Sequence, residues 1–268
     1  MRKMKFWKLS GAGNDFVLLT GGGLTGARLK KLARSLCERK LSVGADGLLY
    51  VNRTGSGAVS VRYFNPDGSE AFCGNGSRCA ALWASRRGLV SGSFTLRTIA
   101  GDLEARVLSR GMVEMRMPDV RAVSLRHPGS YPAGVREVHF LDTGVPHAVV
   151  QVRSAAAADV ERLGRALRHN RAFGGPGANV NFVEVRNGGL VVRTYERGVE
   201  GETLACGTGI AASAVALVLD GKVRSPVDVT ARSGERFRVS LRPGEGGASE
   251  IRMSGPAALV FEGRLMVV

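Results

Sequence analysis

Two short stretches, Cys73-Gly74-Asn75-Gly76 and Cys206-Gly207-Thr208-Gly209, decide how this chain is organised. Each follows a β-type run that begins with Val-Arg, over residues 61–64 before the first stretch and over residues 192–195 before the second. The two cysteines are separated by about half of the 268-residue chain, so the repeating unit is about half the chain. The sequence therefore predicts two similar lobes related by duplication.

The lobes are expected over residues 1–120 and 121–256, and residues 120–134, rich in proline and glycine, have the composition of a linker. Helical spacing appears over residues 29–36 and 160–167. Short β-type runs dominate, mostly as antiparallel hairpins, at residues 16–20, 47–51, 59–64, 102–107, 112–117, 148–152, 181–185, 190–195 and 236–241. The predicted class is α+β, each pseudo-symmetric lobe being a mostly antiparallel sheet curled around a central buried helix.

Composition narrows the function classes. The chain has 38 basic and 23 acidic residues, a net charge of +15, and 44% hydrophobic residues. The arginines are scattered, without the aromatic-interleaved basic stripe that nucleic-acid binders use, so a nucleic-acid partner is not expected. Lys8 interrupts the first apolar stretch and the longest apolar run, residues 210–219, is too short to span a bilayer. A cytoplasmic protein with a small-molecule partner and no membrane role is expected.

The segments after both Cys-Gly-x-Gly stretches are small, apolar and helical in character, which places each cysteine at the start of a buried helix. A helix N-terminus has unpaired backbone N–H groups and a positive dipole end, so it stabilises a thiolate and binds a carboxylate. Two such termini in the cleft between the lobes would place one sulfur on either side of a substrate carbon. That arrangement suits inversion, which needs a base on one face and an acid on the other.

A buried packing role is the usual fate of a free cysteine, and it remains the interpretation for Cys37 and Cys79, each on or inside an apolar helix. Without a secretory signal the four cysteines do not indicate a disulfide scaffold. A zinc site is not expected, because no Cys-x-x-Cys or His-x-x-x-His spacing is present.

The chain resembles diaminopimelate epimerase, a family of cofactor-independent two-thiol epimerases and racemases. The resemblance runs end to end through seven ordered blocks: Gly11-Ala12-Gly13-Asn14-Asp15-Phe16, Gly44-Ala45-Asp46-Gly47, Tyr63-Phe64-Asn65-Pro66-Asp67-Gly68-Ser69-Glu70, Cys73-Gly74-Asn75-Gly76-Ser77-Arg78-Cys79, Thr143-Gly144-Val145-Pro146-His147, Asn179-Val180-Asn181-Phe182, and Tyr195-Glu196-Arg197-Gly198 with Ala205-Cys206-Gly207-Thr208-Gly209.

The resemblance implies interconversion of the LL and meso forms of 2,6-diaminoheptanedioate for lysine and peptidoglycan synthesis, without pyridoxal phosphate or another cofactor. It makes Cys73 and Cys206 the acid–base pair, with His147 and Glu196 near the thiols and the reacting amine. It also implies a homodimer and a C-terminal strand, residues 257–268, that returns to the first lobe. The implied substrate-binding residues are Asn14, Asn65, Gly74, Asn75, Asn179, Glu196, Arg197, Gly207 and Thr208.

Plainer interpretations stay open for several of these residues. Asn14 and Asn65 could simply form turns, His147 could cap a strand, and Glu196 could pair with Arg197 at the surface. Val145 and Gly47 stand where some family members have amide side chains, which leaves the substrate range open. The rival functions are a racemase of another amino acid on the same scaffold, a thiol redox protein and, from the charge alone, a nucleic-acid binder.

Overall fold

The computed structural model describes residues 2–267; Met1 and Val268, which fall within the expected first lobe, lie outside the described residues. The chain divides into two compact units, Met1–Met115 with Gly255–Val268, and Arg116–Ser254. Residues 120–134, expected to form a linker, lie inside the second unit, where Val120 forms a bridge to Ala248. No helix within residues 2–267 is long and apolar enough to cross a membrane.

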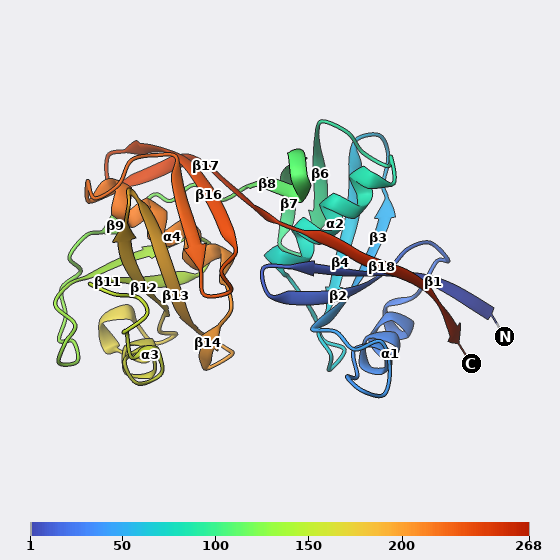
Figure 1. The fold of residues 1–268 in the computed structure, drawn as a ribbon, viewed down its shortest axis with the longest axis horizontal. Coiled ribbons are helices and arrows are strands. Elements are labelled where there is room, and N and C mark those ends of the chain that lie inside the picture. Colours follow the sequence, from blue (N-terminus) through green and yellow to red (C-terminus); the bar gives the residue numbers. More distant parts are fainter. Residues whose placement is uncertain (1, 268) are drawn as a thin grey trace. The chain divides into compact units, whose positions relative to one another are not determined.

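The first unit is one curled sheet with a helix on each face (Figure 1). Pairing runs in the order β18, β1, β2, β3, β4, β6, β7, β8, with β5 added to the end of β4. Its elements are β1 (Arg2–Gly11), β2 (Asn14–Leu19), α1 (Gly26–Leu36), β3 (Gly47–Arg53), β4 (Ala58–Phe64), β5 (Glu70–Ala71), α2 (Gly74–Arg86), β6 (Ser93–Thr98), β7 (Gly101–Val107), η1 (Ser109–Gly111), β8 (Met112–Arg116) and β18 (Ala258–Val267).

The second unit repeats this design. Pairing runs in the order β9, β10, β11, β12, β13, β15, β16, β17, with β14 added to the end of β13. Its elements are β9 (Val123–Ser124), β10 (Val138–Asp142), β11 (Pro146–Gln151), α3 (Val160–Arg168), η2 (Arg171–Phe173), β12 (Asn179–Arg186), β13 (Gly189–Glu196), β14 (Gly201–Thr203), α4 (Gly207–Leu219), β15 (Val227–Ala231), β16 (Arg236–Gly244) and β17 (Gly247–Pro256).

The two units match strand for strand, which confirms the pseudo-symmetric α+β fold. In both, the pairing is antiparallel except at the strands that flank a helix, where β2–β3 and β4–β6 in the first unit and β11–β12 and β13–β15 in the second are parallel. A helix between two strands returns the chain to the same end of the sheet, so those neighbours run in one direction. All nine predicted β-runs are strands, and the C-terminal strand β18 pairs with β1 along its length (Figure 1).

The central helix of the first unit is held from nearly every side. Residues 75–84 of α2 are all buried, and α2 contacts β1, β2, β3, β4, β7 and β18. Phe16 and Leu18 of β2 point to α2, whereas the alternate residues Val17 and Leu19 pack with α1 on the other face. Because both faces of the inner strands are covered, these strands read as continuous apolar runs.

In the second unit, α4 is the buried helix and α3 covers the opposite face. Residues 209–217 of α4 are buried, and α4 contacts β10, β11, β12, β13, β15 and β16. Helix α3 lies against β13 at Gly164, where a Cβ would stand only 2.5–2.8 Å from atoms of the buried Tyr195. Glycine is therefore required at this point by packing.

We expect Gly164→Ala to lower the free energy of unfolding of the second unit, because overpacking usually costs about 1–3 kcal/mol. The better helix propensity of alanine offsets up to ~1 kcal/mol of that cost. Chemical denaturation should show the change, and Gly175→Ala, whose added Cβ would meet no atom within 4 Å, is the control. Equal or greater stability of Gly164→Ala would contradict the packing argument.

Candidate active site

Cys73 is the N-cap residue of α2. Its backbone is extended (φ −140°, ψ 112°), and its Sγ accepts a hydrogen bond from the Gly76 backbone N–H at 3.4 Å. The N–H groups of Gly74 and Asn75 lie in the same first turn, where helical N–H groups have no partner within the helix. The half-buried thiol is thus held beside donors that favour an anion.

A matching ion pair anchors the approach to each cysteine. Arg62 on β4 forms a two-pronged pair with Glu70 on β5, both N–O distances being 2.7 Å. In the second unit Arg193 on β13 pairs with Glu202 on β14 at 2.6 and 2.7 Å. Planar paired contacts of this kind fix geometry as well as charge, so the Val-Arg repeat seen in the sequence ties down the strand that leads to each helix start.

An amide chain connects the first turn of α2 to the β1–β2 hairpin. Asn75 Nδ2 donates to Asn14 Oδ1 at 2.8 Å, and Asn14 Nδ2 donates to Asp46 Oδ2 at 3.0 Å. Arg78, which is fully buried, donates to Asn75 Oδ1 at 2.5 Å. The structure therefore brings Asn14 and Asn75 together and links them to Asp46 and Arg78, which sequence reasoning did not single out.

The packing of Tyr63 explains why position 47 is a glycine in this chain. A Cβ there would overlap the Tyr63 ring, whose hydroxyl donates to the Asp46 carbonyl at 3.1 Å. Burial, with a further contribution from Cys73, raises the pKa of Tyr63, so its hydroxyl stays protonated. Tyr63 thus fills the space that an amide side chain at position 47 would need.

Asn65 lies apart from this amide chain. Its Nδ2 donates to Ser69 Oγ at 2.9 Å, and its backbone N–H donates to the Ser69 carbonyl in the turn that joins β4 to β5. Asn65 therefore shapes the loop before Cys73, as the turn interpretation predicted.

Cys206 is the N-cap residue of α4, but its environment differs from that of Cys73. It is buried, and its Sγ lies 3.4 Å from Thr208 Oγ1. Burial, together with the nearby carboxyl of Glu196, raises the pKa of Cys206 to about 12. This thiol therefore holds its proton at neutral pH, and burial also raises the pKa of Glu196.

Asn179 and Arg197 meet at the end of the paired strands β12 and β13. Asn179 Oδ1 accepts from the Arg197 backbone N–H at 2.9 Å, and Asn179 Nδ2 donates to the Pro146 carbonyl at 3.2 Å. Among residues 2–267 the half-buried Arg197 guanidinium forms no ion pair, so the surface pair with Glu196 considered from the sequence is absent. Arg197 is left with its charge available to a carboxylate.

His147 is fully buried on β11 and belongs to a polar cluster beneath α4. Its Nδ1 lies 3.1 Å from Asn181 Nδ2, and Thr194 Oγ1 donates to Asn181 Oδ1 at 2.9 Å. Burial, with the charge of Arg197, lowers the pKa of His147 to about 3, so the ring is neutral. Asn181 and Thr194 were not predicted as site residues, because each reads as one polar position in an apolar strand.

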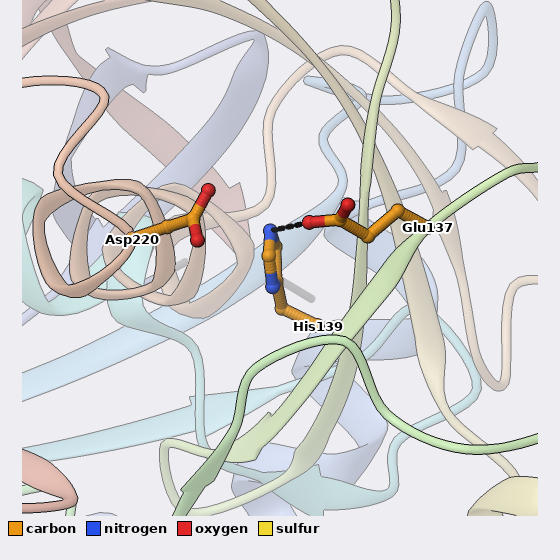
Figure 2. Close-up of side chains that lie close together, drawn as sticks. All are labelled: Glu137, His139 and Asp220. Carbon is orange, nitrogen blue, oxygen red and sulfur yellow. Dashed lines mark ion pairs between the residues drawn. The ribbon is translucent and has the colours of Figure 1, made fainter.

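Figure 2 shows the one group of described residues arranged closely enough to suggest a metal centre, Glu137, His139 and Asp220 at the end of α4. The Arg126 backbone N–H donates to His139 Nδ1 at 3.3 Å, so the proton of the neutral ring sits on Nε2, the atom that faces the carboxylates. The Arg126 side chain also pairs with Asp220 at 2.8 Å. The group is an ion-pair cluster whose imidazole presents a donor instead of a metal-binding lone pair.

The chain matches the family model described as diaminopimelate epimerase over residues 6–123 and 139–260. It is 37% identical to diaminopimelate epimerase of Hydrogenobaculum sp. and 39% identical to that of Aquifex aeolicus, with 98% of both chains covered in each case. The chain belongs to the diaminopimelate epimerase family.

This diaminopimelate epimerase family member is also similar to solved structures, in fold alone. A Bacillus anthracis phenazine biosynthesis protein of the PhzF family is 17% identical, with a TM-score of 0.72 over 100% of both chains. A hydroxyproline epimerase from Agrobacterium vitis is 17% identical, with a TM-score of 0.65 over 99% of this chain and 91% of its own.

Alkylation should distinguish the two thiols of this family member. We expect iodoacetamide to modify half-buried Cys73 before buried Cys206, Cys37 and Cys79, as mapped by peptide mass spectrometry. Glu196→Gln should speed modification of Cys206, because losing that carboxylate lowers the thiol pKa. Modification of Cys206 as fast as Cys73 in the unchanged chain would contradict the assigned environments.

Proposed function

We propose that this protein interconverts LL- and meso-2,6-diaminoheptanedioate; the relatives that it matches are named diaminopimelate epimerases. The observation that carries the proposal is that each unit has a cysteine at the N-terminus of its buried helix, followed by two backbone N–H donors. Inversion of a carbon needs a base on one face and an acid on the other. Two cysteines can fill both roles, one as thiolate and one as thiol.

In the proposed reaction, Cys73 acts as thiolate and Cys206 as thiol. The Cys73 sulfur removes the α-hydrogen of the LL substrate, and the electron pair left on carbon is stabilised through the adjacent carboxylate. The first-turn N–H groups of Gly74, Asn75, Gly207 and Thr208 would hold that carboxylate. Cys206 then delivers its proton to the opposite face, which inverts the carbon and leaves Cys206 as the thiolate.

This assignment of roles follows from the difference between the two helix starts. Cys73 Sγ accepts an N–H bond and is half-buried, whereas Cys206 is buried beside Glu196 with its pKa raised to about 12. The first environment favours an anion and the second a neutral thiol. The reverse reaction, from the meso form, would use the same pair with the roles exchanged.

Arg197 is proposed to recognise the distal carboxylate, because its guanidinium forms no ion pair within residues 2–267 and its backbone is fixed by Asn179. Asn14 and Asn179 would add amide contacts, and Asn65 would bind the substrate from the separate loop before Cys73. Glu196 would lie near the reacting amine. We place the reaction in cytoplasmic lysine and peptidoglycan precursor synthesis, carried out by a homodimer without a cofactor.

A racemase of a different amino acid is the second candidate, and the observation that favours it is the pair Gly47 and Val145. Tyr63 fills the space beside Gly47, and Val145 offers no side-chain hydrogen bond. A panel of amino acids scored by chiral chromatography separates the candidates: faster turnover of a monocarboxylic amino acid than of diaminopimelate would overturn the substrate assignment.

Each catalytic thiol should be indispensable. Cys73→Ala and Cys206→Ala should each lower the rate of LL-to-meso interconversion by at least about 10²–10⁴-fold, the range that general acid–base groups contribute. The assay is chromatographic separation of the stereoisomers, and Cys37→Ala, which removes a buried thiol outside the site, is the matched control.

Interconversion at near the unchanged rate by either catalytic variant would remove that cysteine from the mechanism. Inactivity of Cys37→Ala together with both variants would instead indicate a loss of folding, which circular dichroism would reveal.

A further inference from the structure

The two units present different chemistry at equivalent positions beneath their helix starts. Strand register makes His147 on β11 the counterpart of Phe16 on β2, since each pairs with the first residue of the next strand. It likewise makes Asn181 and Thr194, which pair across β12 and β13, the counterparts of Leu49 and Tyr63. The first unit packs its helix start on mainly apolar groups, and the second unit on a buried polar cluster.

The polar cluster lies directly under the first turn of α4. A Cβ on Gly209 would overlap Asn181 Oδ1 and would stand 3.3 Å from Thr194 Oγ1. His147, Asn181 and Thr194 are at most 3% exposed. Buried polar groups are costly unless they are satisfied, so a cluster retained at this point needs a reason other than packing.

The cluster determines which nitrogen of His147 carries the proton. The Ala148 carbonyl can only accept, and it lies 3.1 Å from Asn181 Nδ2, so the amide nitrogen must face it. In this orientation the Thr194 hydroxyl donates to Asn181 Oδ1. The second hydrogen of Nδ2 then points to His147 Nδ1, which must accept, and the proton of the neutral ring resides on Nε2.

His147 Nε2 is buried and has no hydrogen-bond partner among the described residues. A buried donor without an acceptor is uncommon in folded proteins and calls for an explanation, which a ligand or a catalytic role would supply. Burial, with the charge of Arg197, lowers the pKa of His147 to about 3, so the ring is neutral and carries a single proton.

We propose that Asn181 and Thr194 are positioning residues that lock His147 as a neutral Nε2–H donor toward an anionic group of the reacting complex. This inference rests on the proposed epimerase function, in which negative charge develops beside the reacting carbon. A neutral donor strengthens its hydrogen bond as that charge grows, without the pH dependence of an imidazolium.

The test is Asn181→Asp, which keeps the shape of the side chain and replaces the N–H donor with an acceptor. His147 would then have to donate through Nδ1, leaving Nε2 as a bare acceptor. We expect ¹⁵N NMR, with His147→Gln used to assign the signal, to show protonated Nε2 in the unchanged protein and protonated Nδ1 in the variant. We expect kcat to fall by about 10²-fold or more with KM changed far less.

The pH dependence provides an independent readout. With a pKa of about 3, His147 should stay neutral from pH 5 to 9, and its NMR signal should not titrate there. In Asn181→Asp the adjacent carboxylate favours the charged ring, so the pKa should rise. The Nδ1 tautomer of the variant, and its loss of kcat, should therefore be measured at a pH above that raised pKa.

Thr194→Val serves if Asn181→Asp folds poorly. Without the hydroxyl, the Asn181 amide loses one hydrogen bond but keeps its contact with the Ala148 carbonyl, so kcat should fall about 10-fold. Thr194→Ser, which keeps a hydroxyl, should retain most of the kcat of the unchanged protein. Ser213→Ala is the matched control, since it removes another buried polar bond, the one within α4 from Ser213 Oγ to the Gly209 carbonyl at 2.7 Å. The His147 tautomer and kcat should be unchanged in this variant.

The outcomes separate the inference from the function on which it rests. An unchanged protein with protonated Nδ1, or an Asn181→Asp variant with a switched tautomer and undiminished kcat, would overturn the positioning role while epimerisation stands. Absence of epimerisation in the unchanged protein would overturn the proposed function, whatever the tautomer.

Discussion

The structure depends on burying one helix of each unit on nearly every side. Such a helix needs a sheet curled around it, and each unit meets this requirement with six strands that contact its central helix. Burial of α2 and α4 fixes where their first turns lie, and with them the sulfur and the N–H groups used for chemistry. Precision at the helix start is thus a consequence of packing along the rest of the helix.

Duplication supplies two helix starts of one design, and later sequence changes have made them unlike. Cys73 accepts a backbone N–H and is half-buried, whereas Cys206 is buried beside Glu196. Beneath the helices, apolar Phe16 and Leu49 correspond to His147 and Asn181. A symmetric scaffold therefore carries an asymmetric set of polar groups, which gives the two thiols different surroundings.

The sequence predicted the features that are encoded locally. The Cys-Gly-x-Gly repeat and the apolar segments after it identified both helix starts, and alternating apolar residues located nine strands correctly. The parallel pairs at α1, α2, α3 and α4 were missed, because strand direction depends on the returning helix. Neither the Tyr63 ring beside Gly47 nor the role of Asn181 could be read from the sequence, because each depends on register between strands distant in the chain.

The central claim is that the hydrogen removed from one face of the substrate carbon differs from the hydrogen added to the other. The most direct measurement is mass-spectrometric analysis of a reaction started with LL substrate in heavy water and stopped after a few per cent conversion. The account predicts that the meso product carries one deuterium on the inverted carbon while the remaining LL substrate carries none. Early product that retains the original hydrogen would show transfer by a single group and would contradict the account.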